Sequence, residues 1–181
     1  MTARSLIAAV AAVLMPAMAQ AQTQPAAVPP PAQPVTCAAM DKAVPAPWTE
    51  WTAPGALLGG STLGAAGKLV VGHAYTAALA ASPGVTYIVP LNKPAAPETF
   101  AGLFTLNVDK AGTYSIALSE GAWIDVAPVA GPVLSSVSHA HGPECTTIRK
   151  VVDFALQPGA YVVQVSGATR SPVVIAVEPK A

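Results

Sequence analysis

The fold class of this chain is decided by the segment Phe154-Ala-Leu156-Gln-Pro-Gly159-Ala-Tyr161-Val-Val163-Gln-Val165-Ser166. Apolar residues occupy alternate positions on both sides of the turn at Gly159, which is the period of a β-strand with one buried face. The glycine permits a tight turn, and Tyr161 and the aliphatic residues after it share one face. We interpret the segment as a hairpin whose apolar face lies against a core.

A second segment has the same design. Phe104-x-Leu106 leads through a turn to Gly112-x-Tyr114-x-Ile116-x-Leu118-Ser119, and this turn is longer by three residues. The likeness is either an echo imposed by the sheet or an internal duplication, and the sequence leaves both open. Either origin predicts a sandwich.

Short strands with turn signals follow one another from Lys68 onward. Gly or Pro interrupts the apolar residues about every eight to twelve residues, which is typical of an all-β sandwich or barrel. Further strands are expected at residues 69–79, 85–89, 122–126, 146–156 and 172–177. With the two hairpins they total about seven or eight strands, a number that suits two packed sheets. We predict an antiparallel β-sandwich with jelly-roll-like topology.

Residues 1–21 have the features of a secretory signal peptide. Arg4 supplies a positive charge, an apolar run follows it, and Ala17-Met-Ala19 matches a small-x-small cleavage site. No later apolar run approaches the ~20 residues that a membrane-spanning helix needs, so we expect no membrane span after the signal is removed. The chain is therefore predicted to be periplasmic or secreted.

Residues 22–35 are nearly all Pro, Ala, Gln and Val, a composition that favours extended conformations and cannot form a core. We interpret them as a linker, and residues 36–181 as a single β-sandwich domain of ordinary size. The two cysteines of the chain, Cys37 and Cys145, lie in this domain. Because paired cysteines persist as disulfides in oxidising compartments, export predicts a bond between Cys37 and Cys145.

The composition and the missing motifs exclude several classes of function. The chain has nine basic and nine acidic residues and no basic run, whereas nucleic-acid binding requires a basic patch. It has no Gly-x-Ser-x-Gly motif, no unpaired cysteine to act as a nucleophile and no glycine-rich loop to hold phosphate. We therefore predict no nucleic-acid partner, no nucleotide cofactor and no hydrolytic catalytic residue.

Ligand-type residues cluster in His139-Ala-His141-Gly-Pro-Glu144-Cys145. His139 and His141 are two positions apart, so on a strand both imidazoles would face the same side, and Glu144 follows after a turn. Two histidines and a carboxylate can hold Fe(II), and imidazole-rich sites also suit Cu and Zn. The alternative is an exposed loop that the disulfide holds, with solvated histidines.

Four short elements resemble those of known proteins. The spacing His139-x-His141-x-x-Glu144 resembles the first cupin motif, although cupins place three or four residues before the glutamate and this chain places two. Trp123-Ile-Asp125-Val, Cys145-Thr-Thr-Ile148-Arg149-Lys150 and Leu156-Gln-Pro-Gly159-Ala-Tyr161 are similar to elements of short exported bacterial proteins, some of which are described as homogentisate 1,2-dioxygenases. That resemblance implies an iron site at His139, His141 and Glu144. Homogentisate 1,2-dioxygenase itself is a much longer cytoplasmic cupin protein, and this chain is too short for its architecture.

Residues 150–178 resemble the final hairpin of the secreted jelly-roll modules known as pre-peptidase C-terminal domains. The shared pattern is Phe-x-Leu, a turn, and Gly-x-Tyr-x-Val-x-Val. The resemblance implies a jelly-roll fold. Those modules typically carry calcium-binding acidic residues, which the sequence does not allow us to place.

Aromatic and charged residues form a second candidate site at Trp123, Asp125, Arg149 and Lys150. On neighbouring strands they would make a face for a carbohydrate, cell-envelope or protein ligand, and Trp48 and Trp51 could join it. The alternatives place Trp123 in the core and Asp125 in a cross-strand ion pair with Arg149 or Lys150.

The sequence therefore predicts an exported, non-catalytic binding or structural module of the periplasm or cell surface. The alternative is a metal-binding protein or a non-haem metal-dependent oxygenase that uses His139, His141 and Glu144. A binding module should depend on Trp123 and its charged neighbours, and a metalloprotein should depend on the two histidines.

Overall fold

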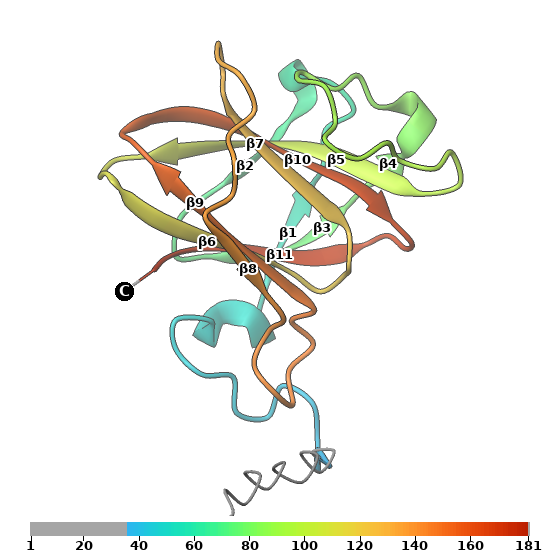
Figure 1. Cartoon of the computed structure of the whole chain (residues 1–181). Helices are drawn as coiled ribbons and strands as arrows, with labels where there is room; N and C mark the ends of the chain where they lie inside the picture. The colour runs from blue at the N-terminus through green and yellow to red at the C-terminus, as the bar shows by residue number, and fades with distance from the viewer. Residues whose placement is uncertain (1–35, 181) are drawn as a thin grey trace, which may run out of the picture. The chain divides into compact units, whose positions relative to one another are not determined.

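The structure is a computed structural model in which residues 36–180 are described. The predicted signal peptide at 1–21 and the predicted linker at 22–35 lie outside the described residues. Two sheets pack against each other, and three short 3-10 helices lie outside the sheets (Figure 1). The strands are β1 (Gly55–Leu58), β2 (Gly67–Leu69), β3 (Ala74–Ala78), β4 (Ala80–Ala81), β5 (Phe100–Val108), β6 (Gly112–Leu118), β7 (Trp123–Pro128), β8 (Ser138–Ala140), β9 (Lys150–Leu156), β10 (Gly159–Ala168) and β11 (Val173–Pro179), and the helices are η1 (Thr49–Thr52), η2 (Leu63–Ala65) and η3 (Ser82–Gly84).

The order of the six-stranded sheet is β1-β3-β11-β6-β9-β8, and that of the five-stranded sheet is β2-β5-β10-β7, with β4 also paired to β5. The predicted all-β sandwich is confirmed. Residues 36–180 form eleven strands, more than the seven or eight expected, because short strands with little apolar pattern add to the total. The pairings β1–β3 and β2–β5 are parallel, so both sheets are mixed rather than wholly antiparallel.

The core lies between the sheets and consists of the alternating apolar residues. Phe104 and Leu106 of β5 and Phe154 and Leu156 of β9 are all at most 2% exposed. The same cluster contains Tyr114, Ile116, Leu118, Ile124, Val126, Val152, Tyr161, Val163, Val165, Val173, Ile175 and Val177. Each large aliphatic or aromatic side chain buried here contributes about 1.5–3 kcal/mol, so the period-two pattern accounts for the main stabilising term of the fold.

The two similar segments are not hairpins. Strand β5 lies in the five-stranded sheet and β6 in the six-stranded sheet, and β9 and β10 are divided in the same way. Each turn therefore carries the chain across the core, and the two arches pair with each other, β5 with β10 and β6 with β9. The hairpin interpretation is corrected on this point. A strand that crosses to the opposite sheet still turns its apolar face to the same core, so the pattern is identical in both cases.

A tyrosine secures each crossing. Tyr114 donates from its hydroxyl to the carbonyl of Lys110 at 2.8 Å. Tyr161 donates to the carbonyl of Gln157 at 2.8 Å and accepts the N–H of the same residue at 2.9 Å. Gly159 has φ 153°, which favours glycine. The Gly-x-Tyr motif is thus a tyrosine corner, in which a side chain bonds the backbone of the preceding turn.

Residues 85–89, which we expected to form a strand, contain none. They belong to a segment, residues 82–99, that covers the outer face of the five-stranded sheet. Val85 and Tyr87 pack there against Leu103. Their apolar alternation reflects this covering contact rather than a strand.

One side chain supplies the hydrogen bonds that a strand partner would otherwise give to this covering segment. The N–H groups of Ile88 and Val89 donate to Gln164 Oε1 at 2.7 and 3.1 Å. Gln164 Nε2 donates in return to the carbonyl of Val89 at 3.1 Å. Gln164 is fully buried, so its amide has all these bonds in a dry environment, where each lost bond would be costly.

Two other expected strands have different bounds. Residues 69–79 divide into β2 and β3 at a turn where Gly72 has φ 89°, a conformation that glycine adopts readily. Residues 146–149 precede β9 instead of belonging to it. There the N–H and hydroxyl of Thr147 donate to the carboxylate of Asp41 at 2.7 and 2.5 Å, which holds this stretch as a loop.

The outer face of the six-stranded sheet is covered by the residues that precede β1, coloured blue to cyan in Figure 1. Trp48 and Trp51 are 7% and 3% exposed and pack against Ala117, Ile148 and Ala176. Because they are buried in this contact, the two tryptophans do not join a binding face.

The predicted disulfide between Cys37 and Cys145 is confirmed, with the Cα atoms 5.3 Å apart. Next to it the N–H of Asp41 donates to the carbonyl of Cys145 at 2.9 Å. Trp51 Nε1 donates to Thr147 Oγ1 at 2.9 Å. The segment that precedes β1 is therefore attached to the loop before β9 by one covalent bond and several hydrogen bonds.

Candidate functional site

The histidine segment does not bring its ligand-type residues together. His139 lies on β8 opposite Val152, and His141, just after β8, donates from Nδ1 to the carbonyl of Arg149 at 3.3 Å. The two imidazoles line different cavities, and His139, His141 and Glu144 are all exposed. Among residues 36–180, no group of three or more His, Cys, Asp or Glu side chains is placed to hold a metal ion. The predicted Cu, Zn or Fe site therefore has no preformed ligand set in this part of the chain.

Trp123 begins β7, an edge strand of the five-stranded sheet, and is 37% exposed. The alternative that placed it in the core is wrong. Its indole Nε1 donates to Asp125 Oδ1 at 3.0 Å, and Asn92 Nδ2 donates to the same oxygen at 2.8 Å. Asp125 is only 1% exposed. A buried carboxylate thus fixes the orientation of the indole and uses its N–H, which leaves the faces of the ring for other contacts.

Lys150 approaches this tryptophan from the other sheet. Its Nζ lies 4.9 Å from the centroid of the Trp123 ring and donates to the carbonyl of Ala122 at 2.8 Å. A cation over an indole is attracted by the π-electrons. Burial lowers the pKa of Lys150 and the charge of Lys93 lowers it further, while Asp125 partly opposes both effects.

Arg149 does not belong to the same group. It is exposed, and it lies in the loop before β9 rather than on the strand that carries Lys150. Within the described part of the chain, Asp125 makes no ion pair with either basic residue. The expected cross-strand pair is absent because β7 and β9 belong to different sheets.

Trp123 lines two cavities. The first has a volume of about 220 Å³, and its walls include Lys93, Thr99 and Ser166. The second has a volume of about 230 Å³, and its walls include Ser136, His139 and Lys150. We call them the Lys93 cavity and the Lys150 cavity. Together with Trp123 and Asp125 they constitute the Trp123 site.

Two buried polar atoms near the indole have no hydrogen-bond partner among residues 36–180, namely Asp125 Oδ2 and Ser166 Oγ. Ser166 lies directly opposite Trp123 on β10 and lines the Lys93 cavity, and Asp125 lies opposite Gln164. Leaving a buried polar group unpaired costs about 1–3 kcal/mol. Such atoms mark positions where a water molecule or a ligand group would be bound.

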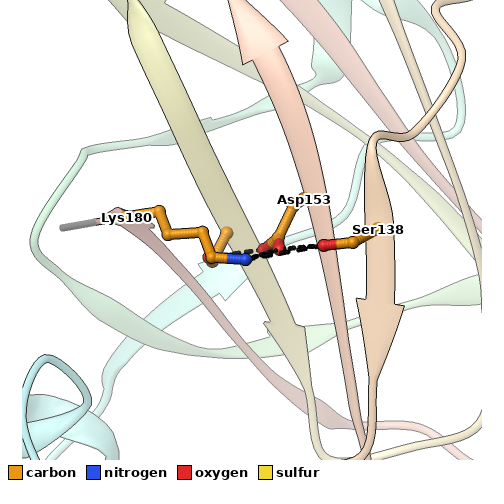
Figure 2. Close-up of polar contacts among 4 residues, drawn as sticks. Ser138, Asp153 and Lys180 are labelled. Carbon is orange, nitrogen blue, oxygen red and sulfur yellow. Dashed lines mark hydrogen bonds and ion pairs between the residues drawn. The ribbon is translucent and has the colours of Figure 1, made fainter.

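A second polar cluster surrounds Asp153 on β9 (Figure 2). Ser115 donates to Asp153 Oδ1 at 2.6 Å, while Lys180, at 2.5 Å, and Ser138 both donate to Oδ2. Ser138, Asp153, Ser115 and Glu178 occupy directly opposed positions on β8, β9, β6 and β11. The sequence did not reveal this row, because strand register rather than spacing assembles it. The available signal was a polar residue at one outward position of each strand.

The geometry of the Asp153 cluster argues against catalysis by Ser138. Burial by itself raises the pKa of Asp153, but the bonds from Lys180, Ser115 and Ser138 outweigh it and hold that pKa below its usual value of 3.8. A carboxylate of low pKa is a poor general base, and Lys180 serves it as the balancing cation. The cluster lacks a group to accept the Ser138 proton and is best described as a stabilising network.

A cavity of about 600 Å³ lies beside this network, between the segment that precedes β1 and the six-stranded sheet. Trp48, His141, Asp153 and Lys180 contribute to its walls. Its polar groups already bond one another, in contrast to the unpaired atoms of the Trp123 site.

Among the described residues, no helix is long and apolar enough to cross a membrane. No protein-family model matches the chain, and no curated protein is significantly similar to it. The functional interpretation therefore rests on the geometry of the Trp123 site.

Proposed function

We propose that this protein is an exported, non-catalytic binding module whose ligand is a carbohydrate of the cell envelope. The observation that carries the proposal is the half-exposed indole of Trp123, anchored through Nε1 to the buried carboxylate of Asp125. An aromatic ring of fixed orientation beside a few convergent polar groups is the usual construction of a small-ligand site. The apolar face of an indole matches the C–H face of a sugar ring.

The contacts of Trp123 fix the orientation of its exposed indole, which distinguishes it from an exposed apolar residue without such contacts. Asn92 and Trp123 both donate to the same oxygen of Asp125, and Lys150 lies against the ring. The side chain therefore loses little further conformational freedom when a ligand binds, which favours affinity. Residues of this type dominate the binding energy of many interfaces.

The proposed location, in the periplasm or outside the cell, is supported by the Cys37–Cys145 disulfide, since such bonds persist in oxidising compartments. The competing function, a metal-binding protein or metal-dependent oxygenase, would need His139 and His141 to converge. Their side chains line different cavities.

A glycan array that contains peptidoglycan fragments and other envelope oligosaccharides tests the proposal. We expect the protein to bind at least one glycan. Trp123→Ala should weaken that binding about tenfold or more, and Trp123→Phe, which keeps a flat ring, should weaken it less. Leu58→Ala is the control, because it removes another exposed apolar side chain on a strand of the other sheet.

Two results would contradict the proposal. The first is an absence of glycan binding by the parent protein. The second is binding that Trp123→Ala leaves unchanged. Retention of one equivalent of Cu, Zn or Fe that disappears in a His139→Ala, His141→Ala double variant would instead favour the metalloprotein.

A further inference from the structure

The charged side chains that line the two cavities beside Trp123 are lysines. Lys93 lines one of its two cavities, and Lys150 lines the other. None of the described residues that line either cavity is acidic. Asp125 lies nearby but is buried, with one oxygen bonded to Asn92 and Trp123.

The charge of Lys93 acts on Lys150. The charge of Lys93 is one of the causes that lower the pKa of Lys150, after burial. The Lys150 ammonium is therefore destabilised by burial and by Lys93, and Asp125 compensates only in part. An anion bound next to Trp123 would be attracted by both cations, and because the site is partly buried, solvent screens these interactions less than at an open surface.

Two acidic residues adjoin the walls of the Lys93 cavity along the chain, Glu98 before Thr99 and Glu120 before Gly121, and neither lines the cavity. Glu98 is exposed to solvent. Glu120, which precedes Gly121 in the wall of the Lys93 cavity, pairs with Arg170 at 2.7 Å. It therefore does not balance the charge of Lys93.

Ser166 adds a second, independent indication of a ligand. Its hydroxyl is buried without a hydrogen-bond partner among residues 36–180, and the residue lines the Lys93 cavity opposite Trp123. A hydroxyl group can both donate and accept, which suits the hydroxyl groups of a sugar. The cavity volume of about 220 Å³ admits a single sugar ring rather than a chain.

We infer that the Lys93 cavity is a subsite for one anionic sugar unit, an assignment that rests on the proposed glycan-binding function. The sugar ring packs against the indole of Trp123, its carboxylate or phosphate pairs with the ammonium of Lys93, and one of its hydroxyl groups bonds Ser166. The Lys150 ammonium, over the same indole, strengthens the attraction for the anion.

Isothermal titration calorimetry with matched sugars tests this inference. The carboxylate arm compares galacturonate with its methyl ester, which has the same ring and no charge. The phosphate arm compares mannose 6-phosphate with mannose. We expect the charged member of at least one pair to bind about fivefold tighter, and this preference to weaken as salt concentration rises.

Variants test whether the preference for charged sugars arises in the Lys93 cavity. Lys93→Gln should remove the discrimination between charged and neutral members, and Ser166→Ala should weaken the binding of both. Lys42→Gln, an exposed lysine on the segment that covers the other sheet, should change neither. Because Lys93 is exposed, its substitution should leave the melting temperature unchanged.

The outcomes separate the two proposals. Glycan binding that depends on Trp123 but is equal for charged and neutral sugars, or unaffected by Lys93→Gln, overturns the anionic subsite and leaves the binding function intact. Failure of the parent protein to bind any glycan, charged or neutral, overturns both.

Discussion

Asp153 and Glu178 are two buried carboxyl groups in the same polar row. Their environments shift their pKa values in opposite directions. Hydrogen bonds from Lys180, Ser115 and Ser138 lower the pKa of Asp153 against the effect of burial. Burial raises the pKa of Glu178, and the nearby charge of Glu50 raises it further, with partial compensation by His73. One group therefore stabilises the fold as an anion, and the other destabilises it.

The pH dependence of two variants should show this difference. Glu178 contributes stability below its usual pKa of 4.5 that is lost as pH rises through its higher folded-state pKa. We expect Glu178→Gln to raise the melting temperature at about pH 7, and the gain to vanish below about pH 4. Thermal unfolding followed by circular dichroism measures both.

Asp153→Asn is the matched variant, and its effect on stability should be opposite to that of Glu178→Gln. Asp153 contributes stability above its usual pKa of 3.8 that is lost as pH falls through its lower folded-state pKa. The substitution should cost about 1–3 kcal/mol at neutral pH and progressively less in acid. The same pH trend in both variants would show that the assigned shifts are incorrect.

At the scale of the elements, the two arches are held by tyrosine hydroxyls rather than by the turn sequences alone. The hydroxyl of Tyr161 makes two bonds to the backbone of Gln157, and that of Tyr114 makes one to Lys110. The arches define which sheet each long strand enters. Removal of a hydroxyl should therefore loosen a crossing without changing the core.

We expect Tyr161→Phe to lower the free energy of unfolding by about 1–3 kcal/mol, and Tyr114→Phe by about 1 kcal/mol, because it loses one bond instead of two. Tyr75→Phe, on β3 and outside both arches, is the control and should have little effect. Urea unfolding measures the three values. Equal losses in all three variants would count against a special role for the arch tyrosines.

The sequence predicts the inner face of each strand well, because burial of one face imposes a period of two that is visible without the fold. It does not distinguish an arch from a hairpin, since Phe154, Leu156 and Tyr161 face the core in both. It also misassigns residues 85–89, because the bonds that replace a strand partner come from Gln164, 75 or 76 positions away.

Prediction of the candidate site is partial for the same reason. Trp123, Asp125 and Lys150 do converge, and the type of each residue was sufficient to suggest a binding face. The inclusion of Arg149 is wrong because it depends on a strand over residues 146–156, whereas β9 begins at Lys150 and leaves Arg149 in the exposed loop before it. Ser166 and Lys93 carry no local motif, and only the packing of β7, β10 and the segment 82–99 brings them to the indole.

At the scale of the whole domain, each sheet has an irregular segment over its outer face, and the two segments are attached differently. Residues 82–99 are held by the amide of Gln164 and by apolar contacts. The residues before β1 are held by the disulfide, by Asp41 and by the two buried tryptophans. Loss of the disulfide should therefore weaken the contact between the residues before β1 and their sheet without abolishing it.

We expect Cys37→Ser, Cys145→Ser or chemical reduction to destabilise the domain. The chain-entropy model sets an upper value of about 4.7 kcal/mol for a loop of this size. Urea titrations with and without dithiothreitol measure the loss of unfolding free energy. The fluorescence of Trp48 and Trp51 reports whether the segment that precedes β1 stays bound to its sheet. An unchanged unfolding midpoint after complete reduction would refute a stabilising role for the bond.

The disulfide also determines how the domain would respond to tension. Cys37 and Cys145, 108 positions apart in the sequence, are joined by a covalent bond, so a force applied at residue 36 passes directly to residue 145. Pulled between residues 36 and 180, the chain could lengthen only through residues 146–180, whatever happened to the other strands. A mechanical load would thus reach β9, β10 and β11 first, and most of the chain would contribute no length until the sulfur bridge was reduced.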